Sequence, residues 1–128
     1  MKKSLIALCI FFLIIIFFTI AALISRNSID FTPYGGDDFA HIYIFLILSF
    51  LLCFSGLIYK RYIYLILFSY GLFIEILQFV VGVGRSFSYL DISYNFIGIG
   101  LGLISYFLFS KIKKYYKWVY QTIHIITI

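Results

Sequence analysis

Four long apolar runs dominate this sequence and limit what it can fold into. They cover approximately residues 4–24, 39–59, 62–82 and 90–109, and each is close to the length of a membrane span. A helix needs about 20 apolar residues to cross roughly 30 Å of hydrocarbon, at about 1.5 Å per residue. The sequence therefore predicts an all-α, polytopic integral membrane protein: one domain over residues 1–128, with a bundle of four transmembrane helices and a basic tail at 110–128.

Composition supports the membrane class over the soluble one. The chain is 64% hydrophobic and only 12% charged, which is far from the usage of soluble domains. Lys2 and Lys3 before the first apolar run could also mark a secretory signal peptide. That run is longer than the usual 7 to 15 residues of a signal peptide, and no clean A-x-A cleavage site follows it. We therefore expect a retained membrane anchor.

The basic residues are distributed unevenly between the segments that join the apolar runs. Only Arg26 and Arg85 fall on one side of the predicted membrane, and the other eight fall on the opposite side: Lys2, Lys3, Lys60, Arg61, Lys111, Lys113, Lys114 and Lys117. Basic residues favour the cytoplasmic side, so we expect a cell-membrane protein with both termini in the cytoplasm. The net charge of +5 thus indicates topology and not nucleic-acid binding. The basic tail could also attract anionic lipid.

Unusual polar residues gather at the predicted outer ends of three helices. They lie at the start of the second helix, the end of the third and the start of the fourth: Asp37, Asp38, His41, Glu75, Gln78, Asp91 and Asn95. Arg85 lies in the short connection between the last two helices. An acid in mid-membrane costs about 2.5 to 3.5 kcal/mol, less near the boundary, so such residues normally face the interior of a bundle.

The polar residues of the third and fourth helices share faces with glycines. Gly71, Glu75, Gln78 and Gly82 follow spacings of four, three and four, and the same spacings recur in a second set: Asp91, Asn95, Gly98 and Gly102. Glycines let helix backbones approach closely, and polar groups find partners across such contacts. Because a short connection joins the two helices, we expect them to meet through these faces.

This outer cluster supports both a functional and a structural interpretation. As a site, Glu75, Asp91 and His41 are the candidate catalytic acids and base, and the candidate binding residues are Asp37, Asp38, Gln78, Arg85 and Asn95. As structure, Glu75 and Arg85 would form an internal ion pair. The remaining polar residues would then be interhelical hydrogen bonds and a capped helix start.

Two further chemistries are weakly indicated. Histidine and carboxylates can bind a divalent metal, but no tight ligand motif such as H-E-x-x-H is present, so we expect no metal and no cofactor. Ser86 or Ser88 could act as a nucleophile with His41 as its base. Nothing in their spacing requires this, and polar loop residues are the simpler interpretation.

The segments DDFAH, EILQ, GRSFSYLDISYN and NFIGIGLG, in this order between residues 37 and 105, resemble the VanZ-like family of membrane proteins. The residues that match the family pattern are Asp37, His41, Glu75, Gln78, Arg85, Asp91, Asn95 and Gly98. Asp38 and Phe39 depart from it, because the family often has Lys after its first Asp. The resemblance implies a small membrane protein linked to susceptibility to glycopeptide antibiotics such as teicoplanin.

Two classes of function remain open at this point. The first is a protein that binds or modifies a lipid-linked cell-envelope molecule at the outer leaflet, with membrane lipids or a lipid-linked cell-wall precursor as partner. The second is a non-enzymatic assembly factor or a small transporter, working as a homo-oligomer or with a larger membrane enzyme. A carrier should have polar groups through both leaflets, and the inner halves of these helices have almost none. The sequence leaves open whether any reaction is catalysed.

Overall fold

The structure is a computed structural model that describes residues 2–24, 36–81 and 87–126, with the backbone alone described for 2, 3, 36–38, 119 and 121–126. Within these residues the chain forms four α-helices: α1 (Lys2–Leu23), α2 (Gly36–Ser55), α3 (Lys60–Val81) and α4 (Tyr89–Ile126). The all-α prediction is confirmed.

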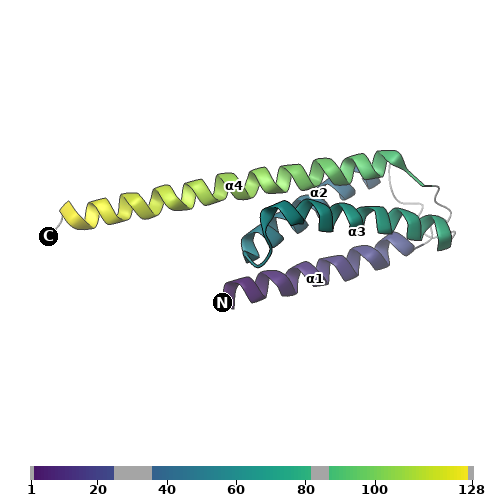
Figure 1. Cartoon of the computed structure of the whole chain (residues 1–128), viewed down its shortest axis with the longest axis horizontal. Coiled ribbons are helices and arrows are strands. Elements are labelled where there is room, and N and C mark those ends of the chain that lie inside the picture. Colours follow the sequence, from purple (N-terminus) through teal and green to yellow (C-terminus); the bar gives the residue numbers. More distant parts are fainter. Residues whose placement is uncertain (1, 25–35, 82–86, 127–128) are drawn as a thin grey trace.

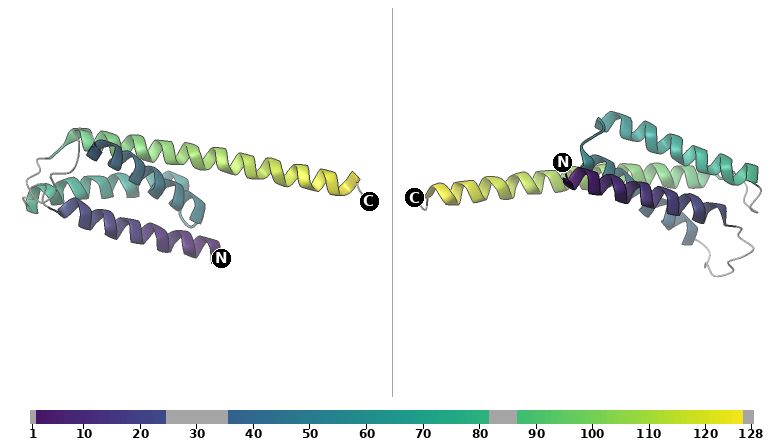
Figure 2. Two further views of the ribbon diagram at one scale, coloured as in Figure 1. Left: turned by 180° about the vertical axis from the view of Figure 1, so that it is seen from behind. Right: turned by 90° about the horizontal axis from the view of Figure 1, so that it is seen from below.

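The helices run up and down along one long axis (Figures 1 and 2). With 38 residues, α4 is roughly 57 Å long, and it extends well past the other three helices at the end of the bundle where α1 starts (Figure 1). We call the opposite end, formed by the last two turns of α1 and α3 and the first two turns of α2 and α4, the polar end. The end with the α2–α3 connection, which carries Lys60 and Arg61, is the basic end.

Helix α2 forms the centre of the bundle. It packs most extensively against α4 and next against α1. Its side chains Phe45, Leu48 and Leu52 are fully buried, as are Ile63, Leu67 and Ile74 of α3 and Ile99 of α4. The spacing of four and three along each helix places these residues on one face, which turns the remaining apolar side chains outward.

The close contact between α2 and α4 depends on glycines of α4. A Cβ atom at Gly98 would collide with the carbonyl oxygen of Ile42, and one at Gly102 would collide with Ser49 Oγ and the carbonyl oxygen of Leu46. The expected contact between α3 and α4 through matching glycine faces is therefore wrong for these two glycines, since both face α2. Gly71 of α3 does face α4, where Asn95 Nδ2 lies 2.9 Å from the position of an added Cβ.

Three of the helices are long and apolar enough to cross a membrane: Ser4–Leu23, Lys60–Val81 and Tyr89–Trp118. Phe39–Ser55, within α2, is a shorter apolar helix. Large apolar side chains such as Phe17 and Val80, each 72% exposed, cover the outside of the bundle. Exposed apolar surface on this scale is unfavourable in water, so the fold is consistent with a membrane protein.

Two predicted helix boundaries are wrong. The second helix ends at Ser55 and not near residue 59, because Gly56 adopts the left-handed conformation (φ 65°) that commonly terminates a helix. The fourth helix does not end at residue 109 but continues to Ile126 through the predicted tail. No glycine or proline follows Gly102, so nothing in the local sequence interrupts the helix.

Candidate functional site

Polar side chains from three helices are buried together at the polar end. His41 of α2 is 3% exposed, Glu75 of α3 is 1% exposed and Asn95 of α4 is 3% exposed, while the side chain of Asp91 is 19% exposed. Burial of so many polar groups is costly unless they satisfy one another. We call His41, Glu75, Asp91 and Asn95 the polar cluster.

His41 is held by two residues of α4, one turn apart. Its Nδ1 atom lies 2.8 Å from Asn95 Oδ1, and its Nε2 atom lies 3.9 Å from Asp91 Oδ2. Because an amide oxygen can only accept, this hydrogen bond requires the proton on Nδ1, whose N–H donates to Asn95 Oδ1. Nε2 is thereby directed at Asp91, at a distance too long for a direct hydrogen bond but short enough for an ion pair when the ring is protonated.

Glu75 makes a helix-capping contact from the neighbouring helix. Ser88 directly precedes α4 and caps it, because its Oγ accepts a hydrogen bond from the Asp91 backbone N–H at 3.2 Å. In a capping box the side chain three residues later would accept the N–H of the capping serine. Here the N–H of Ser88 is donated to Glu75 Oε2 at 3.2 Å instead. This arrangement leaves the carboxylate of Asp91 available to His41.

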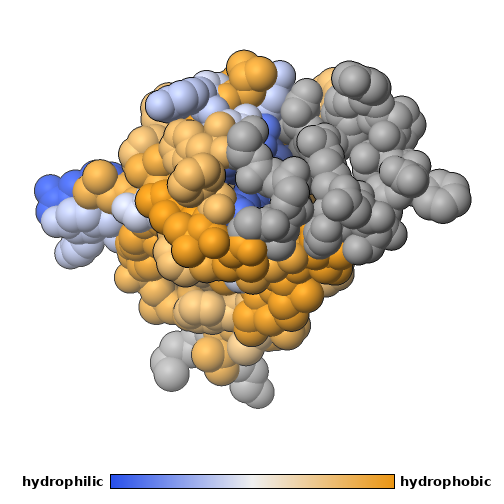
Figure 3. Space-filling view, turned by 90° about the vertical axis from the view of Figure 1, so that its right-hand side faces the viewer, coloured by the Kyte–Doolittle hydropathy of each residue, from blue (hydrophilic) through white to orange (hydrophobic). Residues whose placement is uncertain are grey.

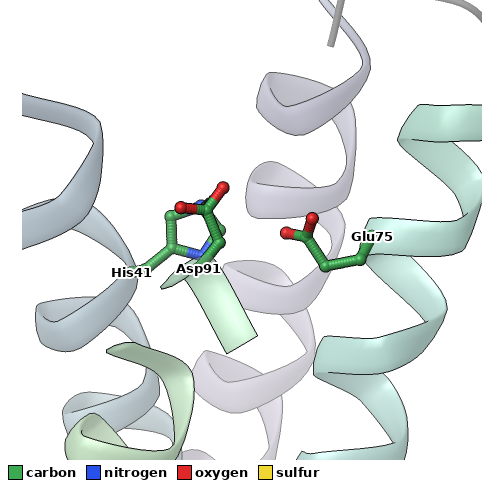
Figure 4. Close-up of side chains that lie close together, drawn as sticks. All are labelled: His41, Glu75 and Asp91. Carbon is green, nitrogen blue, oxygen red and sulfur yellow. Dashed lines mark ion pairs between the residues drawn. The ribbon is translucent and has the colours of Figure 1, made fainter. Parts of the chain in front are cut away.

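The three ionisable side chains of the polar cluster converge on one point. His41, Glu75 and Asp91 each offer one nitrogen or oxygen ligand atom, and these atoms lie within 4.8 Å of one another. Figure 4 shows the Glu75 carboxylate, on α3, pointing toward His41 and Asp91. The group can pass a proton between a nitrogen and two carboxylates, and its donor set also suits a divalent metal ion. The expectation that no metal binds here stays a prediction.

Aromatic rings close the polar cluster on the side of the bundle core. Phe18 of α1 meets the His41 ring edge to face, with centroids 5.4 Å apart, and Phe18 in turn packs against Phe45 and Tyr70. On the opposite side, Figure 3 shows hydrophilic residues near the middle of the polar end, with apolar residues below them and to their left. Access to the cluster is therefore expected from the polar end, where Asp91 is partly exposed.

Gln78 lies outside the polar cluster, although its spacing from Glu75 predicts that both side chains share one face of the helix and one site. Its Nε2 donates to the carbonyl oxygen of Ala22 on α1 at 3.0 Å, and the side chain is 2% exposed. Because α1 ends at Leu23, Ala22 offers one of the carbonyls that no longer has a partner within its own helix. The contact gives Gln78 a structural role in joining α3 to α1.

Several candidate residues lie outside the described part of the chain. They are Gly82, Arg85 and Ser86, together with the side chains of Asp37 and Asp38. The simpler interpretation of Ser88 from the sequence is a polar loop residue. The Ser-x-x-Asp spacing before an apolar run is, however, a recognisable capping signal. Both ring nitrogens of His41 face α4 side chains, Asn95 and Asp91, so the described contacts give no support to Ser88 as a nucleophile activated by His41.

Comparison with known proteins identified no relatives. No protein-family model, curated protein or solved structure matched this chain.

Proposed function

We propose that this chain is a VanZ-like integral membrane protein that binds or modifies a lipid-linked cell-envelope molecule at the outer leaflet, and so alters susceptibility to glycopeptide antibiotics such as teicoplanin. All four helices cross the cell membrane, with both termini in the cytoplasm. The observation that carries the proposal is the buried polar cluster, in which His41, Glu75 and Asp91 converge at one end of an otherwise apolar bundle.

The separation of charge along the bundle supports this orientation. The described acids, Glu75 and Asp91, lie at the polar end, while Lys60 and Arg61 lie at the basic end and four lysines follow on the extension of α4. Lysine and arginine favour the cytoplasmic side of a membrane. The polar end would then face the outer surface, where the head group of a lipid-linked molecule is found.

The geometry of His41 suits proton transfer. Asn95 fixes the ring so that Nε2 faces Asp91, which is the most exposed member of the cluster. A head-group hydroxyl entering from the polar end would meet Asp91 first and then His41. In this proposal His41 and Asp91 exchange a proton with the bound group, and the Glu75 carboxyl group lies beside them as a further proton acceptor or donor.

A non-enzymatic assembly factor or a small transporter is the alternative. Away from the polar cluster, the described buried polar side chains are few and have local structural uses. The Ser49 hydroxyl donates one bifurcated hydrogen bond, which the carbonyl oxygens of Leu46 and Ile99 share. The Ser55 hydroxyl donates to the carbonyl oxygen of Leu52. A transport path requires polar groups through the full thickness of the bundle, so these contacts favour a site at one surface.

The test is drug susceptibility in a teicoplanin-susceptible bacterium that expresses each variant at matched abundance. We expect His41→Gln and Asp91→Asn to abolish the protection that the unaltered chain gives. The control is Tyr70→Phe, which keeps the ring that packs against Phe18 and removes only a hydroxyl whose hydrogen bonds go to α1, to the Ile15 carbonyl oxygen at 3.1 Å and to Thr19 Oγ1 at 2.9 Å. It should keep protection.

The result that would refute the proposal is equal protection by all three variants and the unaltered chain at matched abundance. The polar cluster would then be a structural feature of the bundle. An unaltered chain that gives no protection, although abundant in the membrane, would instead refute the link to glycopeptides.

A further inference from the structure

A second polar region lies at the other end of the molecule, where α4 extends past the bundle. A cleft of about 450 Å³ opens there between the start of α1, the end of α2 and one face of α4. Lys113, Lys114 and Lys117 line it on the α4 side. The cleft shares no residue with the polar cluster and does not depend on the function proposed for it.

The three lysines are brought together by helix periodicity. With Ser110 they follow the spacing i, i+3, i+4 and i+7, which places all four residues on one face of α4. Lys113 and Lys117 are like charges four residues apart, an arrangement that destabilises a helix unless an anion lies nearby. Within the part of the chain that the structure describes, the acids Glu75 and Asp91 lie at the opposite end, and no carboxylate pairs with these lysines.

The remaining lining of the cleft is amphipathic. Phe54 and Phe109 supply an apolar wall, and the hydroxyls of Ser55 and Ser110 donate to carbonyl oxygens of their own helices, Leu52 and Phe107. The lysine ammonium groups are therefore the donors best placed to bind a ligand. Positive charge beside an apolar wall matches a molecule with an anionic head and an acyl chain better than it matches a free ion.

We propose that this cleft binds the phosphate head group of an anionic phospholipid, with the acyl chains lying against Phe54 and Phe109. Nearby aromatic residues on the extension of α4, Tyr115, Tyr116 and Trp118, are exposed, as is typical of side chains that lie at a membrane interface. The bound lipid holds the extension of α4 at the membrane surface beside the start of α1.

Native mass spectrometry of the detergent-solubilised full chain, titrated with phosphatidylglycerol or phosphatidylcholine, tests the proposal. Phosphatidylglycerol should bind more tightly than phosphatidylcholine, and Lys114→Gln should weaken its binding about fivefold, as expected for one basic residue at a lipid head group. The matched control is Lys111→Gln, which removes the same charge from the neighbouring face of α4, where Lys111 lies over the Phe107 ring. This control should bind phosphatidylglycerol as the unaltered chain does.

Three results would overturn the proposal. If Lys111→Gln weakened phosphatidylglycerol binding as much as Lys114→Gln does, the lipid would be attracted by the net charge of the helix and not bound in a defined cleft. Equal binding of the two lipids would remove the role of the anionic head group. Displacement of phosphatidylglycerol by millimolar inorganic phosphate would assign the cleft to a free anion instead of a lipid.

Discussion

Replacing single glycines of α4 by alanine tests the packing that brings His41 to Asp91 and Asn95. At Gly98 an added Cβ would collide with the Ile42 carbonyl oxygen and lie 3.0 Å from Phe45 Cβ. A backbone carbonyl cannot rotate away, so α2 and α4 would have to separate. At Gly100, two residues along the same helix, the nearest atom is Tyr64 Oη at 3.4 Å, which is an ordinary contact.

The two variants differ in packing but share the same gain in helix propensity. Alanine is favoured over glycine in a helix by about 1 kcal/mol, and this applies at both positions. Overpacking costs typically 1 to 3 kcal/mol, so Gly98→Ala should be less stable than Gly100→Ala by about 2 kcal/mol. For a chain of this size, that difference corresponds to a gap of roughly 5 to 10 °C in melting temperature.

The assay is heating of the detergent-solubilised protein, followed by size-exclusion chromatography of the fraction that stays folded. Gly100→Ala should melt at or above the temperature of the unaltered chain, and Gly98→Ala should melt below both. If Gly98→Ala melts as high as Gly100→Ala, the close approach of α2 and α4 is wrong, and with it the geometry of the polar cluster.

Three further predictions follow from the same structure. Ser49→Ala removes a shared interhelical hydrogen bond to the Ile99 carbonyl oxygen at 3.2 Å, so it should lower the unfolding free energy by only about 0.6 kcal/mol and leave drug susceptibility unchanged. A cysteine at Ser28, with the native cysteines removed, should react with a membrane-impermeant reagent in intact cells; reaction only after permeabilisation would reverse the proposed topology. Purified protein should hold less than one divalent metal ion per chain by elemental analysis, and a stoichiometric ion that is lost in His41→Gln would make the polar cluster a metal site.

The sequence predicted which helix faces are buried better than it predicted which helices meet. Periodicity alone places Glu75 and Asn95 on interior faces, and the structure buries both. The same periodicity gives no information about the partner of a face. The short connection between α3 and α4 suggested that Gly98 would face α3, whereas the central position of α2 makes it the closest neighbour of α4.

The contacts of the candidate site depend on tertiary geometry that no short motif encodes. His41 is separated from Asn95 by 54 residues, and only the packing of α2 on α4 joins them. Gln78 follows Glu75 by three residues and shares its face, yet it reaches α1 instead of the polar cluster. The helical extension to Ile126 was predictable in principle from the absence of glycine and proline after Gly102. The polarity of the tail instead suggested a break at the membrane boundary.

The most direct test of the central claim is the drug susceptibility of cells that express Glu75→Gln at the abundance of the unaltered chain. A glutamine keeps an oxygen that accepts the Ser88 N–H, so the cap of α4 is preserved while the ionisable carboxyl group beside His41 is removed. We predict a folded, membrane-inserted protein that no longer protects against teicoplanin. Full protection by abundant Glu75→Gln protein would contradict the proposal, because the carboxylate would then serve only to cap α4.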